Sequence, residues 1–291
     1  MLPEPMLKRI FAATFLLISL VAGAQPPKVP ASVTFAGQTV RFDRSDMYER
    51  MDRELLTFTY MHSTSTLMLK RAARVFEVVE PILKANGIPD DLKYLMVIES
   101  NLDPMAVSRA GAAGYWQFMQ GTAREFGLEV NANVDERYNL EKATAAACKY
   151  LKGSYARYGD WMSVAASYNA GPAMISKRMD EQGESSAMDL WLVSETSRYM
   201  FRVIACKMLF SDPESFGFKF PEGDSYRKIP VLETVTVTDE IPDLVAFAKN
   251  HHTSYAALKR ANPWLRESRL NNSSHRTYKI VIPAVDDVYK Q

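Results

Sequence analysis

The chain has 291 residues, of which 47% are hydrophobic and 24% are charged, and its formal net charge at pH 7 is +1. This balance argues against a nucleic-acid-binding protein, because such proteins normally carry a clear excess of basic residues. The chain is long enough to bury a sizeable core as one large domain or as two. Its two cysteines, Cys148 and Cys206, form neither a disulfide framework nor a CxxC pair of metal ligands.

The first 24 residues have the pattern of a secretory signal. Lys8 and Arg9 precede the apolar run 10–21, and residues 22–24 (Ala-Gly-Ala) supply a cleavage site of small residues. The run is short for a transmembrane helix, which needs roughly 20 apolar residues. We therefore expect residues 1–24 to be removed on export to the periplasm or cell envelope, leaving no transmembrane helix in the mature chain. A retained anchor is the alternative.

The hydrophobic pattern changes along the mature chain. Residues 25–40 are rich in proline and polar side chains, which predicts an extended linker. Over 41–215 apolar residues recur at spacings of three and four, which predicts a mainly α domain. Helix start and stop signals place its helices at about 67–85, 89–103, 122–126, 140–158, 161–169 and 196–210.

The composition changes again after Pro213. Residues 229–237 alternate like a strand, two helix-like segments follow, and 277–283 give a second strand signal. Two strands that bracket two short helices predict a small α+β module over 228–288. We expect this module to be dispensable for chemistry.

Glu99 is the first candidate for chemistry. Leu92, Leu95 and Met96 precede it at seven, four and three residues, so its carboxyl lies on the apolar face of a helix. Burial on such a face raises the pKa of a carboxyl, which suits a general acid at neutral pH. A carboxylate that points into solvent from the helix end is the alternative that this helix alone leaves open.

Two later segments contain residue types that suit carbohydrate binding. In 111–119 the glycines let the backbone approach another surface, Gln117 offers both a donor and an acceptor, and aromatic rings could stack on sugars. In 165–171 small residues permit close helix packing, and Asn169 lies near a helix end with its amide free. Taken singly, the first segment could equally be an ordinary loop and the second a helix stop.

Taken together and in this order, Glu99-Ser100, GxxGxWQFM at 111–119 and SYNAGP at 167–172 resemble the three motifs of the family-1 lytic transglycosylases, and most of all the D group of membrane-bound lytic murein transglycosylases. Further similarities lie at 92–95, 134–137 and 143–146, so the resemblance covers about residues 45–212. It implies a mainly α, goose-lysozyme-like helical domain of the lysozyme superfamily.

The resemblance also implies roles for single residues. Glu99 would be the catalytic acid/base, with Ser100 its neighbour in the motif. Glu195-Thr196-x-x-Tyr199 resembles a fourth element, whose tyrosine leans towards the catalytic glutamate, although the proline usual two residues later is absent. The remaining residues implied to line the glycan cleft are Gln117, Met119, Tyr168 and Asn169.

Residues 229–288 resemble a LysM-related glycan-binding module, but the usual turn is replaced by Thr-Asp-Glu-Ile-Pro at 238–242. Binding of glycan and a purely structural role both stay open for this module.

The function implied by the resemblance is that of a peptidoglycan lytic transglycosylase. It would cleave the β-1,4 bond between N-acetylmuramic acid and N-acetylglucosamine and leave 1,6-anhydromuramic ends, with glycan strands as its partner and with neither metal nor cofactor. Most glycosidases use two carboxyl groups, and the motifs here frame one, which agrees with a substrate-assisted route. A hydrolysing lysozyme and a non-catalytic peptidoglycan-binding protein are the alternatives.

Overall fold

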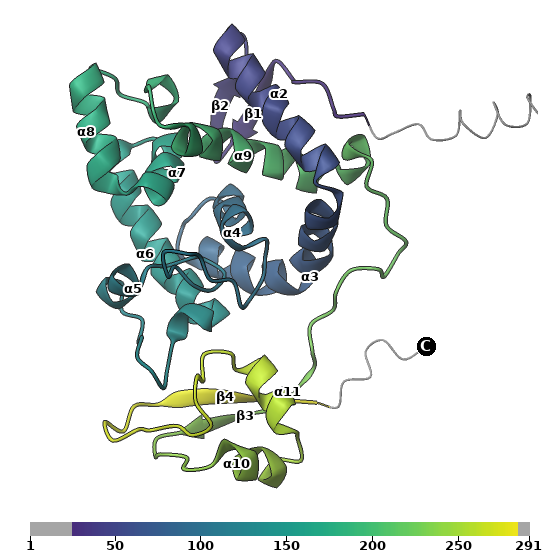
Figure 1. The fold of residues 1–291 in the computed structure, drawn as a ribbon, viewed down its shortest axis with the longest axis vertical. Helices are drawn as coiled ribbons and strands as arrows, with labels where there is room; N and C mark the ends of the chain where they lie inside the picture. Colours follow the sequence, from purple (N-terminus) through teal and green to yellow (C-terminus); the bar gives the residue numbers. More distant parts are fainter. Residues whose placement is uncertain (1–24, 285–291) are drawn as a thin grey trace, which may run out of the picture.

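The computed structural model describes residues 25–284, so the signal expected over 1–24 lies outside the described residues. Figure 1 shows a larger helical part and a smaller part that contains the second sheet. The larger part contains these elements: β1 (Ser32–Phe35), β2 (Gln38–Arg41), α2 (Ser45–Tyr60), α3 (His62–Ala85), α4 (Lys93–Ser100), α5 (Gln120–Glu125), α6 (Leu140–Tyr158), α7 (Trp161–Ala170), α8 (Pro172–Gln182) and α9 (Ser194–Ser211). The smaller part contains β3 (Val231–Val237), α10 (Leu244–Asn250), α11 (Tyr255–Ala261) and β4 (Tyr278–Pro283).

The expected division into a mainly α part followed by a small α+β part is confirmed. Within residues 25–284, none of the helices combines the length and the apolar character that crossing a bilayer would require.

The helix α4 occupies the centre of the larger part (Figure 1) and packs against α3 and α9. Leu92, just before it, and Leu95 and Met96 within it are fully buried. The apolar stripe expected from the sequence therefore anchors the helix. After Ser100 the chain leaves the helix through Asn101 and Leu102, which both have positive φ, 50° and 55°. This sharp end leaves Glu99 in the last turn of α4.

Local capping explains where the neighbouring helices begin. Asn139 accepts a hydrogen bond from the backbone N–H of Lys142 at the start of α6. Asp160 accepts from the N–H groups of Met162 and Ser163 at the start of α7. Such side-chain caps satisfy N–H groups that have no partner inside the helix. The seven residues at the start of α7 are all buried, so this helix is a core element between α6, α8 and α9.

The expectation of an extended linker over 25–40 is wrong for residues 32–40, which together with Arg41 lie in a hairpin. These residues form the antiparallel hairpin β1–β2, in which Ser32 pairs with Arg41 and Phe35 with Gln38. Phe35 is fully buried in the core of the larger part. The hydrogen bond from the N–H of Trp161 to the side-chain oxygen of Gln38 also ties the hairpin to α7. The proline-rich and polar composition of this segment did not indicate that Phe35 would anchor it in the core.

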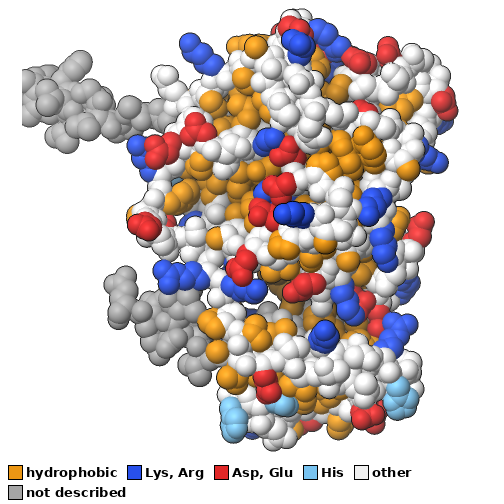
Figure 2. Space-filling view, turned by 180° about the vertical axis from the view of Figure 1, so that it is seen from behind, with side chains coloured by type: hydrophobic (Ala, Val, Ile, Leu, Met, Phe, Trp, Pro, Cys, Tyr) orange, Lys and Arg blue, Asp and Glu red, His pale blue; other side chains and the backbone are white. Residues whose placement is uncertain are grey.

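The smaller part is built on the antiparallel pair β3–β4, with α10 and α11 packed beside it. Its core is centred on Leu244, Leu258, Ile280 and Ile282. Figure 2 shows the face turned away from Figure 1, with basic and acidic side chains interspersed over it and histidines on the smaller part. Both cysteines are buried and unpaired in the larger part.

Candidate active site

Glu99 and Tyr199 meet at the contact between α4 and α9. The hydroxyl of Tyr199 donates a hydrogen bond to Oε1 of Glu99 at 2.7 Å, across 100 residues of sequence. Tyr199 is buried, whereas Glu99 keeps some exposure to solvent. The expected approach of this tyrosine to the glutamate is therefore seen directly.

The electrostatic surroundings of Glu99 favour its protonated form. Desolvation raises the pKa of its carboxyl from an ordinary 4.5 to about 7. The hydrogen bond from Tyr199 opposes this rise, and the negative charge of Glu195 adds to it. At neutral pH a carboxyl with this pKa holds and releases a proton readily, as a general acid and base must.

Tyr168 lies close to the same carboxyl. Burial raises the pKa of its hydroxyl, and the negative charge of Glu99 raises it further. The hydroxyl donates to the backbone oxygen of Trp116 at 2.7 Å, which ties α7 to the loop 111–119. The indole nitrogen of Trp116 in turn donates to the hydroxyl of Thr144 on α6 at 3.0 Å. Tyr168 thus connects the loop to the surroundings of Glu99.

The loop 111–119 has a fixed backbone shape. Gln117 has a positive φ of 49°, and its amide nitrogen donates to the backbone oxygens of Ala106 at 3.0 Å and Gly114 at 2.7 Å. In the described part of the chain its side-chain oxygen accepts no hydrogen bond, so this atom is available to a ligand. Met119, which precedes α5, is 45% exposed. The loop therefore presents one amide oxygen and one thioether beside a rigid backbone.

The two remaining residues singled out from the sequence differ in their surroundings. Ser100 is buried, and its hydroxyl donates to the backbone oxygen of Met96 within α4. Asn169 lies in the last turn of α7 and is partly exposed. Within residues 25–284 no side-chain hydrogen bond of Asn169 is formed, so its amide is available to a ligand.

A hollow of about 470 Å³ opens at the start of α9, lined by Met174, Arg178, Gln182, Trp191, Leu192 and Val193. Trp191 is 83% exposed there. Since Val193 directly precedes α9, the hollow lies at the end of the helix that carries Glu195.

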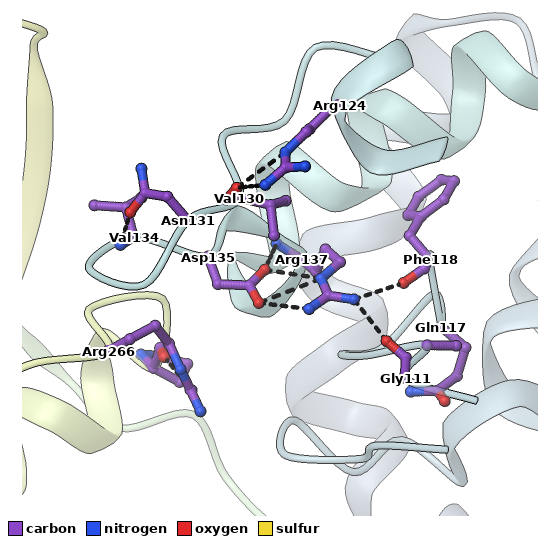
Figure 3. A network of polar contacts seen from close by, with 12 residues as sticks. Gly111, Gln117, Phe118, Arg124, Val130, Asn131, Val134, Asp135, Arg137 and Arg266 are labelled. Carbon is purple, nitrogen blue, oxygen red and sulfur yellow. Dashed lines mark hydrogen bonds and ion pairs between the residues drawn. The ribbon is translucent and has the colours of Figure 1, made fainter. Parts of the chain in front are cut away.

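Sequence reasoning missed the significance of Arg137. It lies in a motif noted for its resemblance, but no role followed from the sequence. In the structure its buried guanidinium pairs with Asp135 and donates to backbone oxygens of the loop 111–119 (Figure 3). The one sequence signal was an arginine two residues after an aspartate, which is too common a pattern to predict this contact.

Residues 79–190 match the transglycosylase SLT domain family, and residues 233–286 match the C-terminal LysM-like domain of soluble lytic transglycosylases. Two successive parts of the chain are thus similar to an SLT domain and to a LysM-like domain, and we call them the SLT domain and the LysM-like domain. Glu99, the loop 111–119 and Tyr168 lie inside the SLT match. Glu195 and Tyr199 follow its last residue but complete the same site.

A curated relative is also similar to this chain. Membrane-bound lytic murein transglycosylase D of Escherichia coli (strain K12) is 26% identical over 230 residues, which cover 77% of this chain. The match spans 49% of that protein, so the chain corresponds to about half of its length.

Two solved structures are similar over smaller parts. The 70 kDa soluble lytic transglycosylase of Escherichia coli is 20% identical, with a TM-score of 0.40, over 47% of this chain and 24% of that one. The lytic transglycosylase Slt of Pseudomonas aeruginosa, an inactive mutant, is also 20% identical, with a TM-score of 0.38, over 52% of this chain and 25% of that one. The SLT assignment rests on the family match and not on these partial likenesses.

Proposed function

We propose that this chain is an exported peptidoglycan lytic transglycosylase with Glu99 as its catalytic acid/base. The observation that carries the proposal is the Glu99 carboxyl, which lies inside an SLT domain, accepts a hydrogen bond from Tyr199 and has a pKa of about 7. The signal pattern of residues 1–24 and the membrane-bound description of the Escherichia coli relative support export to the periplasm or cell envelope.

The reaction uses the same carboxyl twice. Protonated Glu99 donates its proton to the glycosidic oxygen, and the bond from that oxygen to C1 of N-acetylmuramic acid breaks. The N-acetyl group of the same sugar stabilises C1. The Glu99 carboxylate then removes the proton of the 6-hydroxyl, whose oxygen bonds to C1 and closes the 1,6-anhydro ring. No water is consumed, and Glu99 ends protonated as it began.

The other candidate residues have supporting tasks in this proposal. Tyr199 holds the Glu99 carboxyl in one orientation through its hydrogen bond. The amide of Asn169 and the exposed side chain of Met119 contact the glycan, together with the side-chain oxygen of Gln117. Tyr168 and Ser100 act from within the protein, because their hydroxyls donate to backbone oxygens.

Whether a second carboxyl takes part in the reaction distinguishes a transglycosylase from a hydrolysing lysozyme. Asp103 accepts a hydrogen bond from the N–H of Met105 and closes the turn after α4, as expected for a helix stop. Glu195 is exposed, and its charge acts on Glu99. If Glu195 activated a water molecule, the enzyme would be a lysozyme with two working carboxyl groups.

The products distinguish the three functions considered. Purified sacculi are digested with the full mature chain, and the released fragments are analysed by mass spectrometry. The proposal expects 1,6-anhydromuramic ends, which are one water lighter than hydrolysed ends. Reducing muramic ends would identify a lysozyme, and binding of sacculi without any release of fragments would identify a non-catalytic binding protein.

A further inference from the structure

The LysM-like domain is held to the SLT domain by residues 129–138, which we call the bridging segment. The N–H of Asp135 donates to the backbone oxygen of Trp264 at 2.9 Å, and the N–H of Arg266 donates to that of Asn133 at 2.9 Å. The side chain of Asn133 also accepts from the N–H of Asn271 at 2.9 Å. Through these hydrogen bonds the bridging segment pairs with the backbone of the LysM-like domain.

The same segment shares side-chain contacts with the LysM-like domain. The guanidinium of Arg266 lies 4.2 Å from the centre of the Tyr138 ring. Glu129 accepts hydrogen bonds from the hydroxyl of Tyr278 and the guanidinium of Arg276. Residues of the SLT domain are part of the apolar core of the LysM-like domain, namely Ala113, Val134 and Tyr138.

The opposite face of the bridging segment supports the loop 111–119. The guanidinium of Arg137 forms paired hydrogen bonds with the Asp135 carboxylate, at 2.9 and 2.7 Å. Its remaining amino group donates to the backbone oxygens of Gly111 at 2.8 Å and Phe118 at 3.1 Å. As Figure 3 shows, this side chain points from the bridging segment into the loop and reaches both of its ends.

The loop and the bridging segment also meet through their backbones. Gly114 has a positive φ of 75°, and a Cβ at this position would lie 2.0 Å from the backbone oxygen of Arg137. Only glycine permits this approach. Gly111 has a φ of 87°, but a Cβ there would meet nothing within 4 Å. Gly114 is therefore the point at which the backbone of the loop packs directly against the bridging segment.

We propose that Arg137 is a positioning residue and that the docked LysM-like domain, through Asp135 and Arg137, fixes the shape of the loop that binds glycan. This proposal rests on the proposed function. It keeps the expectation that the C-terminal module is dispensable for the chemical step, and it gives that module a part in shaping the loop that binds glycan. A buried guanidinium has a planar fork of donors that lysine cannot reproduce. Its orientation depends on the carboxylate of Asp135, whose own backbone is held by the LysM-like domain.

The test uses two variants of the full mature chain. Asn133→Ala removes the hydrogen bonds of the Asn133 side chain to the LysM-like domain, and Arg137→Lys keeps the charge but loses the fork. Neither residue contacts Glu99. We expect each to raise KM for purified glycan strands about 10-fold, because a loosened loop must be ordered on binding at the expense of glycan affinity, while kcat and the pH dependence of kcat change little. A loss of folded enzyme alone would lower kcat and leave KM unchanged.

The matched control is Asn272→Ala. Asn272 is also a buried asparagine, and its amide donates to the backbone oxygens of Thr238 at 2.8 Å and Arg276 at 2.7 Å, within the LysM-like domain. We expect this variant to lose thermal stability comparably to Asn133→Ala but to keep the wild-type KM. Equal KM in Asn133→Ala and wild type, or equal rises in Asn133→Ala and Asn272→Ala, would overturn the proposal.

A binding measurement separates this proposal from the proposed reaction. Glycan strands are titrated onto Glu99→Gln and onto Glu99→Gln combined with Arg137→Lys. Weaker binding by the combined variant is expected whether the wild-type products are anhydro or hydrolysed, and equal binding would overturn the positioning role. Product chemistry thus tests the function, and affinity tests the positioning.

Discussion

Two carboxyl groups in the interior of the helical part have opposite surroundings. Glu54 on α2 is fully buried and is surrounded by guanidinium groups: it accepts hydrogen bonds from Arg198 and Arg202 on α9 and lies 3.5 Å from Arg53. Glu99 on α4 is less buried, yet its partner is an uncharged tyrosine from the same helix α9. Glu54 and Glu99 therefore both contact α9, and their partners on that helix are only a few residues apart.

The difference shows that burial alone does not prepare a carboxyl for proton transfer. A cationic neighbour stabilises the charged form of an acid, and desolvation without one stabilises the neutral form. Glu54 connects α2 to α9 by ion pairs. Desolvation raises the pKa of Glu99 to about 7, and among residues 25–284 no cation offsets this rise. In the proposed function Glu54 serves structure and Glu99 serves chemistry, and α9 contributes to both.

The largest expected effect follows from removing the proton of Glu99. Glu99→Gln keeps the shape of the side chain but has no transferable proton. General acid–base catalysis contributes roughly 100- to 10,000-fold, and a single group that serves as both acid and base should lie at the upper end. We expect kcat to fall about 10,000-fold while binding of glycan strands persists, as measured by turnover and titration. Near-normal turnover would remove Glu99 from the mechanism.

Glu54→Gln should affect stability instead. It leaves Arg198 and Arg202 without their anion in a partly buried place, and breaking such a pair costs several kcal/mol when it is fully buried. Because both arginines keep some exposure, we expect a loss of about 2 kcal/mol in the free energy of unfolding, measured with urea at pH 7. If the folded Glu54→Gln variant lost activity as completely as Glu99→Gln does, the role of Glu54 would not be purely structural.

The matched control for this loss is the exposed ion pair of Glu181 with Arg178 on α8, at 2.8 Å. Glu181→Gln removes a charge of the same sign from a surface pair, for which contributions of about 0–1 kcal/mol are usual. A loss as large as that of Glu54→Gln would mean that burial of the ion pair makes no difference.

Glu99 should make the stability of the wild type depend on pH in the direction opposite to that of an acid held in an ion pair, and Glu99→Gln should remove this dependence. The pKa of Glu99 is about 7 in the folded state against an ordinary 4.5. Between these pH values the folded protein keeps a proton that the unfolded chain releases, so the wild type loses stability as pH rises. We expect Glu99→Gln to match the wild type below pH 4.5 and to exceed it by about 1–2 kcal/mol above pH 7, after discounting for partial exposure. Urea unfolding of both proteins across this range measures the difference, and a constant difference would contradict the raised pKa.

The sequence predicted these sites unequally, for physical reasons. The apolar stripe before Glu99 is local, so periodicity and the motif were enough to identify it. Glu54 was not noticed, because its partners on α9 follow it by 144 and 148 residues. The sequence predicted no role for Arg137, because both of its carbonyl partners belong to a loop whose path no local pattern specifies. The hairpin at 32–41 was missed because each strand has four residues.

The finest test concerns the two groups that adjust the pKa of Glu99 in opposite directions. The hydrogen bond from Tyr199 lowers it and the negative charge of Glu195 raises it. If Glu99 must begin protonated, kcat/KM falls as pH rises through about 7. Tyr199→Phe removes the lowering contact, so this alkaline limb should move to higher pH. Glu195→Gln removes the raising charge, so the limb should move to lower pH. Profiles of kcat/KM on glycan strands measure both midpoints against the wild type. Shifts of the same sign would show that the variants act through a common disturbance of α9, and a Glu195→Gln enzyme without turnover would instead make Glu195 a second working carboxyl.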